Sequence, residues 1–236
     1  MLTAVPMTRS VGQSGLLYVP ISRMSAADLA RPAQGCFFDR FPCRFDGNSR
    51  RFFYVTHLYL VRHGRAAAGI SESVDPGLDE LGHQQARAAA VALSRYAEMP
   101  LYSSPLLRAK ETAMPLAKQW LSEVIIEPRI SEIPFQSTDL GERARWLQSV
   151  MPGSWRDLDG YWQQWRRNLV DCLLAHTEDA VFFSHFIAIN VAVGAAQNDD
   201  RMVVFRPDNA SITVLSNDGG ALRVIAAGSE ASTHVN

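Results

Sequence analysis

The stretch Phe52-Phe-Tyr-Val-Thr-His-Leu-Tyr-Leu-Val-Arg-His-Gly64 marks the point at which the chain becomes regular. Its first ten residues are rich in β-branched and aromatic side chains, which is typical of a strand buried on both faces. Arginine, histidine and a glycine that lets the backbone turn tightly follow at once. An Arg-His pair at a strand end can form an anion pocket, although a single Arg-His-Gly can equally be a surface turn. The stretch therefore predicts a buried strand that ends at a candidate anion site.

Strands and helices alternate along the chain beyond this stretch. The Ala-rich residues after Leu78 predict a helix, with apolar positions expected at Leu81, Ala88, Val91 and Ala92. Further strands are predicted near 101–102 and at 123–130, 180–184, 210–215 and 221–227, with a long helical region between residues 155 and 176. This alternation predicts a three-layer α/β/α sandwich with a mostly parallel sheet. In such sheets ligands bind beyond the carboxyl ends of the strands.

A second strand end with a charged side chain follows Tyr102. Ser104 can cap the next helix and Pro105 can occupy its first position. Arg108 then lies one turn inside a helix whose N-terminus favours an anion, although an arginine there can equally belong to a solvated helix face. Pro115 lies inside the same helix and predicts a kink or an early end.

A third strand end, Phe182-Phe-Ser-His185, places a histidine beyond an apolar strand. A lone histidine is more often structural than catalytic, but here three such strand ends occur in order. Over roughly Thr56 to Ala227 the chain resembles the histidine phosphatase superfamily, which has the phosphoglycerate-mutase-like fold. The motifs on which the resemblance rests are Leu60-Val-Arg-His-Gly64, Leu78-Asp-Glu-Leu-Gly82 with Gln85-Ala86, Ser103-Ser-Pro-Leu-Leu-Arg-Ala-Lys-Glu-Thr-Ala113, Ser184-His185 and Asp208-Asn-Ala-Ser-Ile-Thr213.

The resemblance implies a catalytic role for each strand end. His63 is the expected nucleophile, forming a phosphohistidine that water later hydrolyses. Arg62 and Arg108 are expected to bind the phosphate and to stabilise the charge that develops in the transition state. His185 is expected to supply a further donor to the same oxygens. The neighbouring guanidinium groups should push the pKa of His63 down, which keeps the attacking imidazole neutral.

The leaving alkoxide also needs a proton. In the family a carboxylate that follows the third strand donates it, and the best match here is Glu132 in Ile130-Ser-Glu-Ile-Pro-Phe135. Protonated, this group can donate to the leaving oxygen, and as a carboxylate it can then activate water. Glu127 is the competing candidate, but it falls within the predicted strand rather than beyond its end.

Three departures from the family pattern bear on the function. Arg65 replaces the acidic and polar residues common in mutases at this point, and is either a third cation on the phosphate side or a solvated arginine. Phe186-Ile187 follow His185 where many relatives have glycines, which predicts a narrower or more apolar pocket floor. The residues from Pro134 to Thr138 lack the Gly/Trp/Glu-rich segment typical of phosphoglycerate mutases. The sequence therefore favours a phosphatase acting on phosphomonoesters, with a mutase-type phosphotransferase and a non-catalytic phosphate-binding or regulatory module as alternatives.

The net charge of −1 conceals a division of the chain of 236 residues. Residues 1–56 contain seven Arg and three Asp, a balance of +4, so the remainder has a balance of −5. We predict a basic, poorly ordered extension over residues 1–51 and a histidine phosphatase domain over 52–236. A basic arm for an acidic partner, an organelle-targeting segment and translated sequence upstream of the true start remain alternatives for the extension. Within the domain, residues 136–161 with Trp146 and Trp155 are expected to form a variable cap, although each tryptophan alone can equally be helix packing.

Several classes of protein and ligand are disfavoured. The longest nearly apolar stretch, from Phe186 to Ala196, has 11 residues, whereas a helix that crosses a bilayer needs about 20. Three cysteines cannot form a fully paired framework, which favours a reducing cytoplasm over secretion. The acidic balance of the domain disfavours nucleic acid, and the histidines have no spacing typical of a metal site. We expect a small phosphorylated substrate and neither cofactor nor metal; the oligomeric state cannot be inferred from the sequence.

Overall fold

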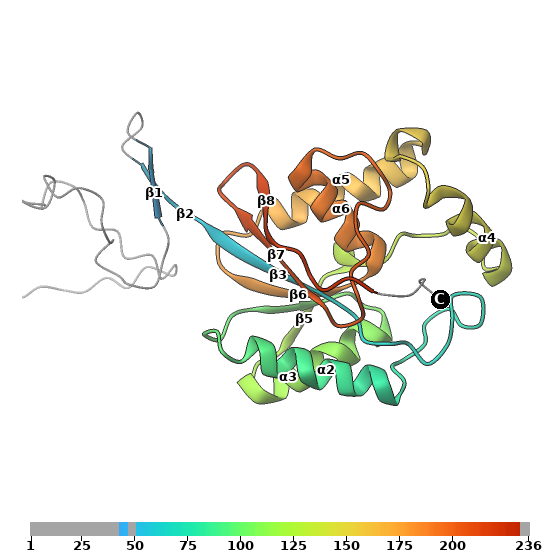
Figure 1. Cartoon of the computed structure of the whole chain (residues 1–236), viewed down its shortest axis with the longest axis horizontal. Helices are drawn as coiled ribbons and strands as arrows, with labels where there is room; N and C mark the ends of the chain where they lie inside the picture. Colours follow the sequence, from blue (N-terminus) through green and yellow to red (C-terminus); the bar gives the residue numbers. More distant parts are fainter. Residues whose placement is uncertain (1–42, 47–50, 232–236) are drawn as a thin grey trace, which may run out of the picture. The chain divides into compact units, whose positions relative to one another are not determined.

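A computed structural model describes residues 43–46 and 51–231 of the chain, with side chains from Val55 onward (Figure 1). The chain divides between Phe41 and Pro42 into two units, and all described residues belong to the second. Most of the predicted extension over residues 1–51 therefore lies outside the described residues. The expected boundary at residue 52 stays a prediction.

The single strand predicted from Phe52 to Val61 is divided at Val55 between two strands, β2 (Arg51–Tyr54) and β3 (Thr56–Arg62). β1 (Cys43–Asp46) and β2 (Arg51–Tyr54) pair with each other in an antiparallel two-stranded sheet. β3 (Thr56–Arg62) belongs to a second sheet of six strands. β-branched and aromatic residues continue through the junction at Val55, so the residue pattern cannot show that the partner strand changes there.

The six-stranded sheet is mostly parallel, as predicted. Its strand order is β5-β4-β6-β3-β7-β8. The parallel neighbours are β5 (Val124–Ile126), β4 (Leu101–Ser103), β6 (Ala180–Ser184) and β3, whereas β7 (Ile212–Asn217) runs antiparallel to β3 and to β8 (Leu222–Ala226). Because β4, β6 and β3 are parallel neighbours, their carboxyl ends meet at one edge of the sheet.

Helices cover both faces of this sheet, which confirms the three-layer architecture. Figure 1 shows α2 (Glu80–Leu93) and α3 (Leu107–Trp120) on one side, and α5 (Gly160–Leu174) and α6 (Phe186–Gln197) on the other. Alternate side chains of β3 serve the two layers: Tyr59 and Val61 pack in the cluster with α2 and α3, and Leu58 and Leu60 in the cluster with α5 and α6. β3 is therefore buried on both faces, as its composition predicts.

The predicted apolar face of α2 is wrong. Leu81, Ala88, Val91 and Ala92 are exposed, and Val91 keeps 70% of its surface in contact with solvent. The residues that α2 buries are Gly82, Ala86, Ala89, Ala90 and Leu93. In an alanine-rich helix several faces are nearly equal in apolarity, so periodicity alone does not select the one that packs.

α3 also differs from its prediction at both ends. The helix begins at Leu107 rather than at Pro105 and continues through Pro115 to Trp120, so the predicted early end is wrong. A proline inside a helix costs about 3 kcal/mol. The last turn buries Leu116 and Trp120, and burying one large apolar side chain gains about 1.5–3 kcal/mol. Packing against the sheet therefore outweighs the cost of the proline.

The strand predicted over 180–184 is confirmed as β6, whereas several other elements shift by a few residues from their predicted bounds. The strand predicted over 123–130 ends at Ile126, because Pro128 cannot donate a ladder hydrogen bond. Glu127 instead caps a short 3₁₀ helix by accepting from the backbone N–H of Arg129 at 3.0 Å. That 3₁₀ helix is η2 (Pro128–Ile130), and the other helical segments are α4 (Leu140–Val150) and η3 (Trp155–Asp157). Among the described helices, none combines the length and the apolar composition that a membrane span requires.

Candidate active site

Four of the predicted site residues lie together at the carboxyl edge of the parallel strands. Arg62 ends β3, His63 follows it, Arg108 lies in the first turn of α3, and His185 follows β6. All four are buried, and the rings of the two histidines are 5.2 Å apart between centroids. The backbone N–H of His63 donates to the carbonyl of Ser184 at 2.9 Å, which continues the pairing of β3 with β6 into the site. Strand pairing therefore fixes the spacing of these side chains.

His63 is held in one orientation by its own neighbour. Its Nδ1 lies 2.7 Å from the carbonyl oxygen of Gly64. Because a carbonyl can only accept, Nδ1 must be the protonated nitrogen, and in a neutral ring Nε2 then has the free lone pair. Burial lowers the pKa of His63 well below its usual value, and the charges of Arg108 and Arg62 lower it further. The structure thus adds burial, as the larger cause, to the effect of the arginines predicted from the sequence.

Arg62 is anchored by backbone and by an aromatic ring. Its Nη1 donates to the carbonyl of Pro207 at 2.8 Å, and its guanidinium lies over the ring of Phe186, 5.1 Å from the centroid. Its Nε is buried without a hydrogen-bond partner among the described residues. The phenyl ring thus contacts one face of the guanidinium, and the remaining N–H groups are available to an anion. The expected apolar floor of the pocket stays a prediction.

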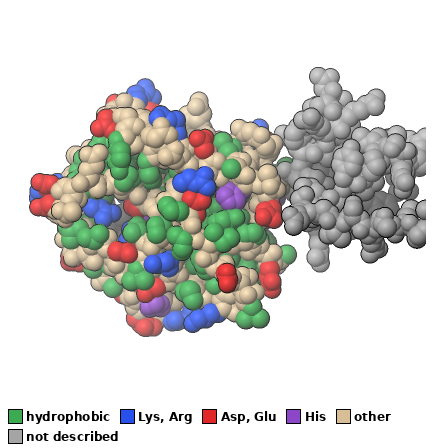
Figure 2. Space-filling view, turned by 180° about the vertical axis from the view of Figure 1, so that it is seen from behind, with side chains coloured by type: hydrophobic (Ala, Val, Ile, Leu, Met, Phe, Trp, Pro, Cys, Tyr) green, Lys and Arg blue, Asp and Glu red, His purple; other side chains and the backbone are tan. Residues whose placement is uncertain are grey.

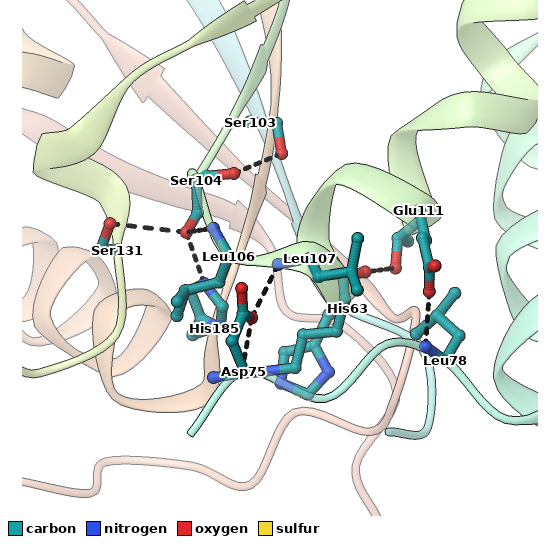
Figure 3. A network of polar contacts seen from close by, with 12 residues as sticks. His63, Asp75, Leu78, Ser103, Ser104, Leu106, Leu107, Glu111, Ser131 and His185 are labelled. Atoms are coloured by element: carbon teal, nitrogen blue, oxygen red, sulfur yellow. Dashed lines mark hydrogen bonds and ion pairs between the residues drawn. The ribbon is translucent and has the colours of Figure 1, made fainter. Parts of the chain in front are cut away.

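Arg108 has an acidic neighbour that the sequence analysis did not identify. Asp75 Oδ1 lies 3.8 Å from Nη1 of Arg108 and accepts a hydrogen bond from the backbone N–H of Leu107 at 2.8 Å (Figure 3). Burial lowers the pKa of Arg108, while Glu132 and Asp75 oppose this effect. Asp75 lies in an irregular loop, 32 residues from Leu107, so no local pattern could connect it with the site.

His185 is positioned by Ser104, for which the sequence analysis predicted only a helix cap. Ser104 Oγ lies 2.8 Å from Nε2 of His185 and also accepts from the backbone N–H of Leu106 at 3.2 Å (Figure 3). The Nδ1 atom of His185 is buried and has no partner in the described part of the chain. When Ser104 donates to Nε2, Nδ1 has the proton and can donate to a phosphate oxygen. Burial, followed by the charges of His63 and the arginines, lowers the pKa of His185 well below its usual value.

The two candidate acids are clearly separated by their contacts. Glu132 accepts from the backbone N–H of Ile187, in the first turn of α6, at 3.2 Å, and its charge acts on both Arg62 and Arg108. Glu127 instead pairs with Arg129 at 2.6 Å, and hydrogen bonds from Arg129 are the main cause of its lowered pKa. The charge of Glu132, rather than that of Glu127, therefore acts on the two arginines predicted to bind phosphate.

Arg65 is not brought to this cluster. Its side chain is 57% exposed, and its Nε lies 2.5 Å from Oδ2 of Asp79, the residue that caps α2. Its predicted role in phosphate binding stays untested, and the ion pair favours the alternative of a solvated arginine.

Gly64 is needed for close packing rather than for a tight turn. It does not adopt a positive φ. A Cβ atom added to it would lie 2.5 Å from the carbonyl oxygen of Gly82 in α2. Its N–H donates to Oγ1 of Thr112, which itself donates to the carbonyl of Arg108. The site loop is thereby fastened to α3 by a threonine that the sequence analysis did not single out.

The segment 136–161, which we call the cap segment, contains α4 and η3. Trp146 stacks on Trp162 with 4.8 Å between ring centroids, and Trp155 is fully buried in the core. Packing therefore accounts for both tryptophans. Arg143 of α4 is different, because its positive charge lowers the pKa of Arg108 and of His185. Its closeness to the site was not predicted.

No three His, Cys, Asp or Glu side chains gather as a metal site in the described ranges 43–46 and 51–231. The chemistry that these residues can supply is that of an anion pocket with a neutral imidazole and a carboxyl group at its edge. Two buried guanidinium groups can bind a phosphate by paired hydrogen bonds.

Comparisons with known proteins agree with this geometry. Residues 58–229 match the family model of the histidine phosphatase superfamily (branch 1). A probable phosphoglycerate mutase, GpmB, of Photorhabdus laumondii is 31% identical over 111 residues, which is 42% of this chain and 52% of the relative. A metal-independent phosphoserine phosphatase of Arabidopsis thaliana is 42% identical over 85 residues, which is 33% of this chain and 35% of that protein. The chain thus spans about half, or less, of the length of these relatives.

A solved structure supports the fold. A putative alpha-ribazole-5'-P phosphatase of Escherichia coli superimposes with a TM-score of 0.61, covering 76% of this chain and 99% of that chain at 18% identity. At this identity the likeness concerns the fold alone.

Proposed function

Because the chain belongs to the histidine phosphatase superfamily, we propose that it is a metal-independent phosphatase that hydrolyses phosphomonoesters through a phosphohistidine on His63. The observation that supports this most directly is the state of His63. Its ring is buried beside two arginines, its Nδ1 is bonded to a backbone carbonyl, and its pKa is lowered. A neutral imidazole with a free Nε2 is the form that can attack phosphorus.

Substrate binding is assigned to the arginines and to His185. A phosphomonoester has up to two negative charges, which Arg62 and Arg108 can neutralise in paired hydrogen bonds. Nδ1 of His185 can donate to a third oxygen. Because these donors are buried and held by other contacts before the substrate arrives, little reorganisation is needed as charge develops on the oxygens.

The first chemical step transfers the phosphoryl group to His63. The Nε2 lone pair forms the P–N bond while the bond from phosphorus to the leaving oxygen breaks. Protonated Glu132 gives its proton to that oxygen, so the leaving group departs as an alcohol. In the second step the Glu132 carboxylate takes a proton from water, the water oxygen attacks phosphorus, and the P–N bond breaks. Inorganic phosphate leaves and the free histidine is restored.

Two alternatives remain for comparison with this proposal. The similarity to a probable phosphoglycerate mutase favours a phosphotransferase, while the residues from Pro134 to Thr138 lack the segment typical of such mutases. A non-catalytic phosphate-binding module is disfavoured, because the nucleophile and three donors converge in one buried cluster. On the face shown in Figure 2, acidic and basic side chains are interspersed, without the extended basic area that a nucleic acid would need.

The decisive experiment compares the wild type with His63→Ala on p-nitrophenyl phosphate and a panel of phosphometabolites, with and without EDTA. We expect turnover that resists EDTA and is lost in His63→Ala, and a phosphorylated, acid-labile histidine in the wild type alone. His83→Ala, a matched change on α2 outside the site, should keep full activity. Transfer of the phosphoryl group between two positions of phosphoglycerate without phosphate release would favour the mutase. Phosphate binding without any turnover would favour the binding module.

A further inference from the structure

Arg143 belongs to the cap segment, and its charge acts on the cluster of candidate site residues. It lies in the first turn of α4, where its backbone N–H donates to the carbonyl of Asp139 at 3.1 Å. Figure 1 shows α4 beyond the carboxyl ends of the central strands. The charge of Arg143 acts on Arg108 and on His185, two of the groups assigned to the phosphate. The side chain therefore approaches the pocket from a different element than the strand ends do.

Arg143 has no anionic partner in the described part of the chain. It takes part in none of the ion pairs there, and its Nε is buried without a hydrogen-bond acceptor. By comparison, Arg156 and Arg166 both pair with Asp200. A buried N–H without an acceptor, on a cation close to other cations, is unfavourable until an anion binds. The partner that Arg143 lacks within the protein is thus expected to come with the ligand.

The transferred phosphate already has its donors. Arg62, Arg108 and His185 lie around the nucleophile, and each is fixed by a contact to another element. Arg143 belongs to the cap segment, where the sequence departs from the family pattern and where the rest of the substrate must lie. Its anion is therefore expected on the leaving group.

On the basis of the proposed phosphatase function, we infer that Arg143 binds a carboxylate on the leaving group, so that the substrates are small phosphorylated hydroxy or amino acids. A planar carboxylate accepts two parallel N–H bonds from a guanidinium. A second phosphate fits less well, because one guanidinium balances a single negative charge. The carboxylates of Asp75 and Asp208 already act on the neighbouring arginines and would repel a second dianion more strongly than a carboxylate with a single charge.

The test uses two substrates that differ in one group. 3-Phosphoglycerate has a carboxylate where glycerol 3-phosphate has a hydroxymethyl group. In Arg143→Gln we expect kcat/KM for 3-phosphoglycerate to fall by roughly ten- to a hundredfold, the effect of losing a charge-assisted hydrogen bond. For glycerol 3-phosphate it should change by less than about threefold. Arg145→Gln, which alters an exposed arginine of the same helix, should leave both values unchanged.

Two results would overturn the inference. An equal loss on both substrates would mean that Arg143 serves the transferred phosphate or the fold. A loss on fructose 1,6-bisphosphate relative to fructose 6-phosphate, without a loss on 3-phosphoglycerate, would assign it to a second phosphate.

Calorimetric binding to His63→Ala separates this inference from the phosphatase proposal, because it needs no turnover. His63→Ala should bind 3-phosphoglycerate more tightly than glycerol 3-phosphate, and adding Arg143→Gln should abolish the preference while leaving the affinity for orthophosphate unchanged. The absence of any preference in His63→Ala would refute the carboxylate site even if the wild type hydrolyses both compounds.

Discussion

The edge of the sheet and the cap segment hold their functional side chains in different ways. At the edge, four candidate catalytic side chains are held by hydrogen bonds: His63 by the backbone of its own loop, Arg62 by Pro207, His185 by Ser104, and Glu132 by α6. These contacts keep the donors in place without a ligand. Preorganisation of this kind is what stabilisation of a transition state requires.

The cap segment is held by aromatic packing, and its cation Arg143 has no acidic partner among the described residues. Trp146 stacks on Trp162 and also lies against Phe135, with 5.4 Å between the ring centroids of Trp146 and Phe135. The buried Nε of Arg143, by contrast, has no hydrogen-bond acceptor among the described residues. We propose a division of labour, in which the edge of the sheet performs a reaction common to phosphomonoesters and the cap segment selects among leaving groups.

The largest expected effect follows from removing a cation at the edge. Arg108→Gln should lower kcat/KM for all phosphomonoesters by about a thousandfold, the order found when one transition-state donor is removed. It should also raise the pKa of His63, because the charge of Arg108 is one of the causes that lower it. The acid limb of the kcat/KM profile, where His63 takes up a proton and stops attacking, should therefore move to higher pH. Profiles of wild type, Arg108→Gln and the exposed control Arg87→Gln test this.

An unchanged acid limb in Arg108→Gln would mean that the limb reports another group, such as the substrate phosphate. A loss confined to substrates with one kind of leaving group would contradict the division of labour, since Arg108 would then act in selection.

A somewhat smaller effect is expected from the proton donor. Glu132→Gln keeps the shape of the side chain but removes the proton that the leaving oxygen needs, and kcat on alkyl phosphates should fall by about a hundredfold. p-Nitrophenyl phosphate should lose much less in the first step, because p-nitrophenolate leaves without protonation. Glu127→Gln is the matched control and should retain activity, since Glu127 contacts Arg129 rather than the pocket. If the two variants were equally impaired, the assignment of the acid to Glu132 would fail.

The sequence located the edge residues because each follows an apolar strand within a few positions. Parallel pairing brings such strand ends together, so Arg62, His63, Arg108 and His185 could be predicted to meet. The contacts that orient them could not be predicted in this way. Ser104 and His185 are 81 residues apart and meet only because β4 and β6 are neighbours.

Other features escaped the sequence analysis for related reasons. The packed face of α2 was missed because an alanine-rich helix has no single apolar stripe. Arg143 was missed because an arginine on a short amphipathic helix looks like any solvated charge. The two groups on which its charge acts, Arg108 and His185, follow β4 and β6 and are far from it in the chain. Local patterns therefore locate the candidate catalytic side chains. The order of the strands decides which other residues orient those side chains or lie close to them.

The smallest effect on chemistry is expected from the packing of the cap segment. Trp146→Ala removes a ring that is partly buried against Trp162 and Phe135, and should lower the free energy of unfolding by about 2 kcal/mol, less than the cost for a fully buried tryptophan. Because the ring packs against Trp162 and Phe135 rather than against the groups proposed to bind phosphate, kcat on p-nitrophenyl phosphate should stay within about threefold of wild type. Denaturant unfolding and steady-state kinetics measure the two quantities. Trp146→Phe should recover most of the stability, and a fall in kcat comparable to that of Glu132→Gln would show that the cap segment helps to position the reacting groups and that the two regions are not separable.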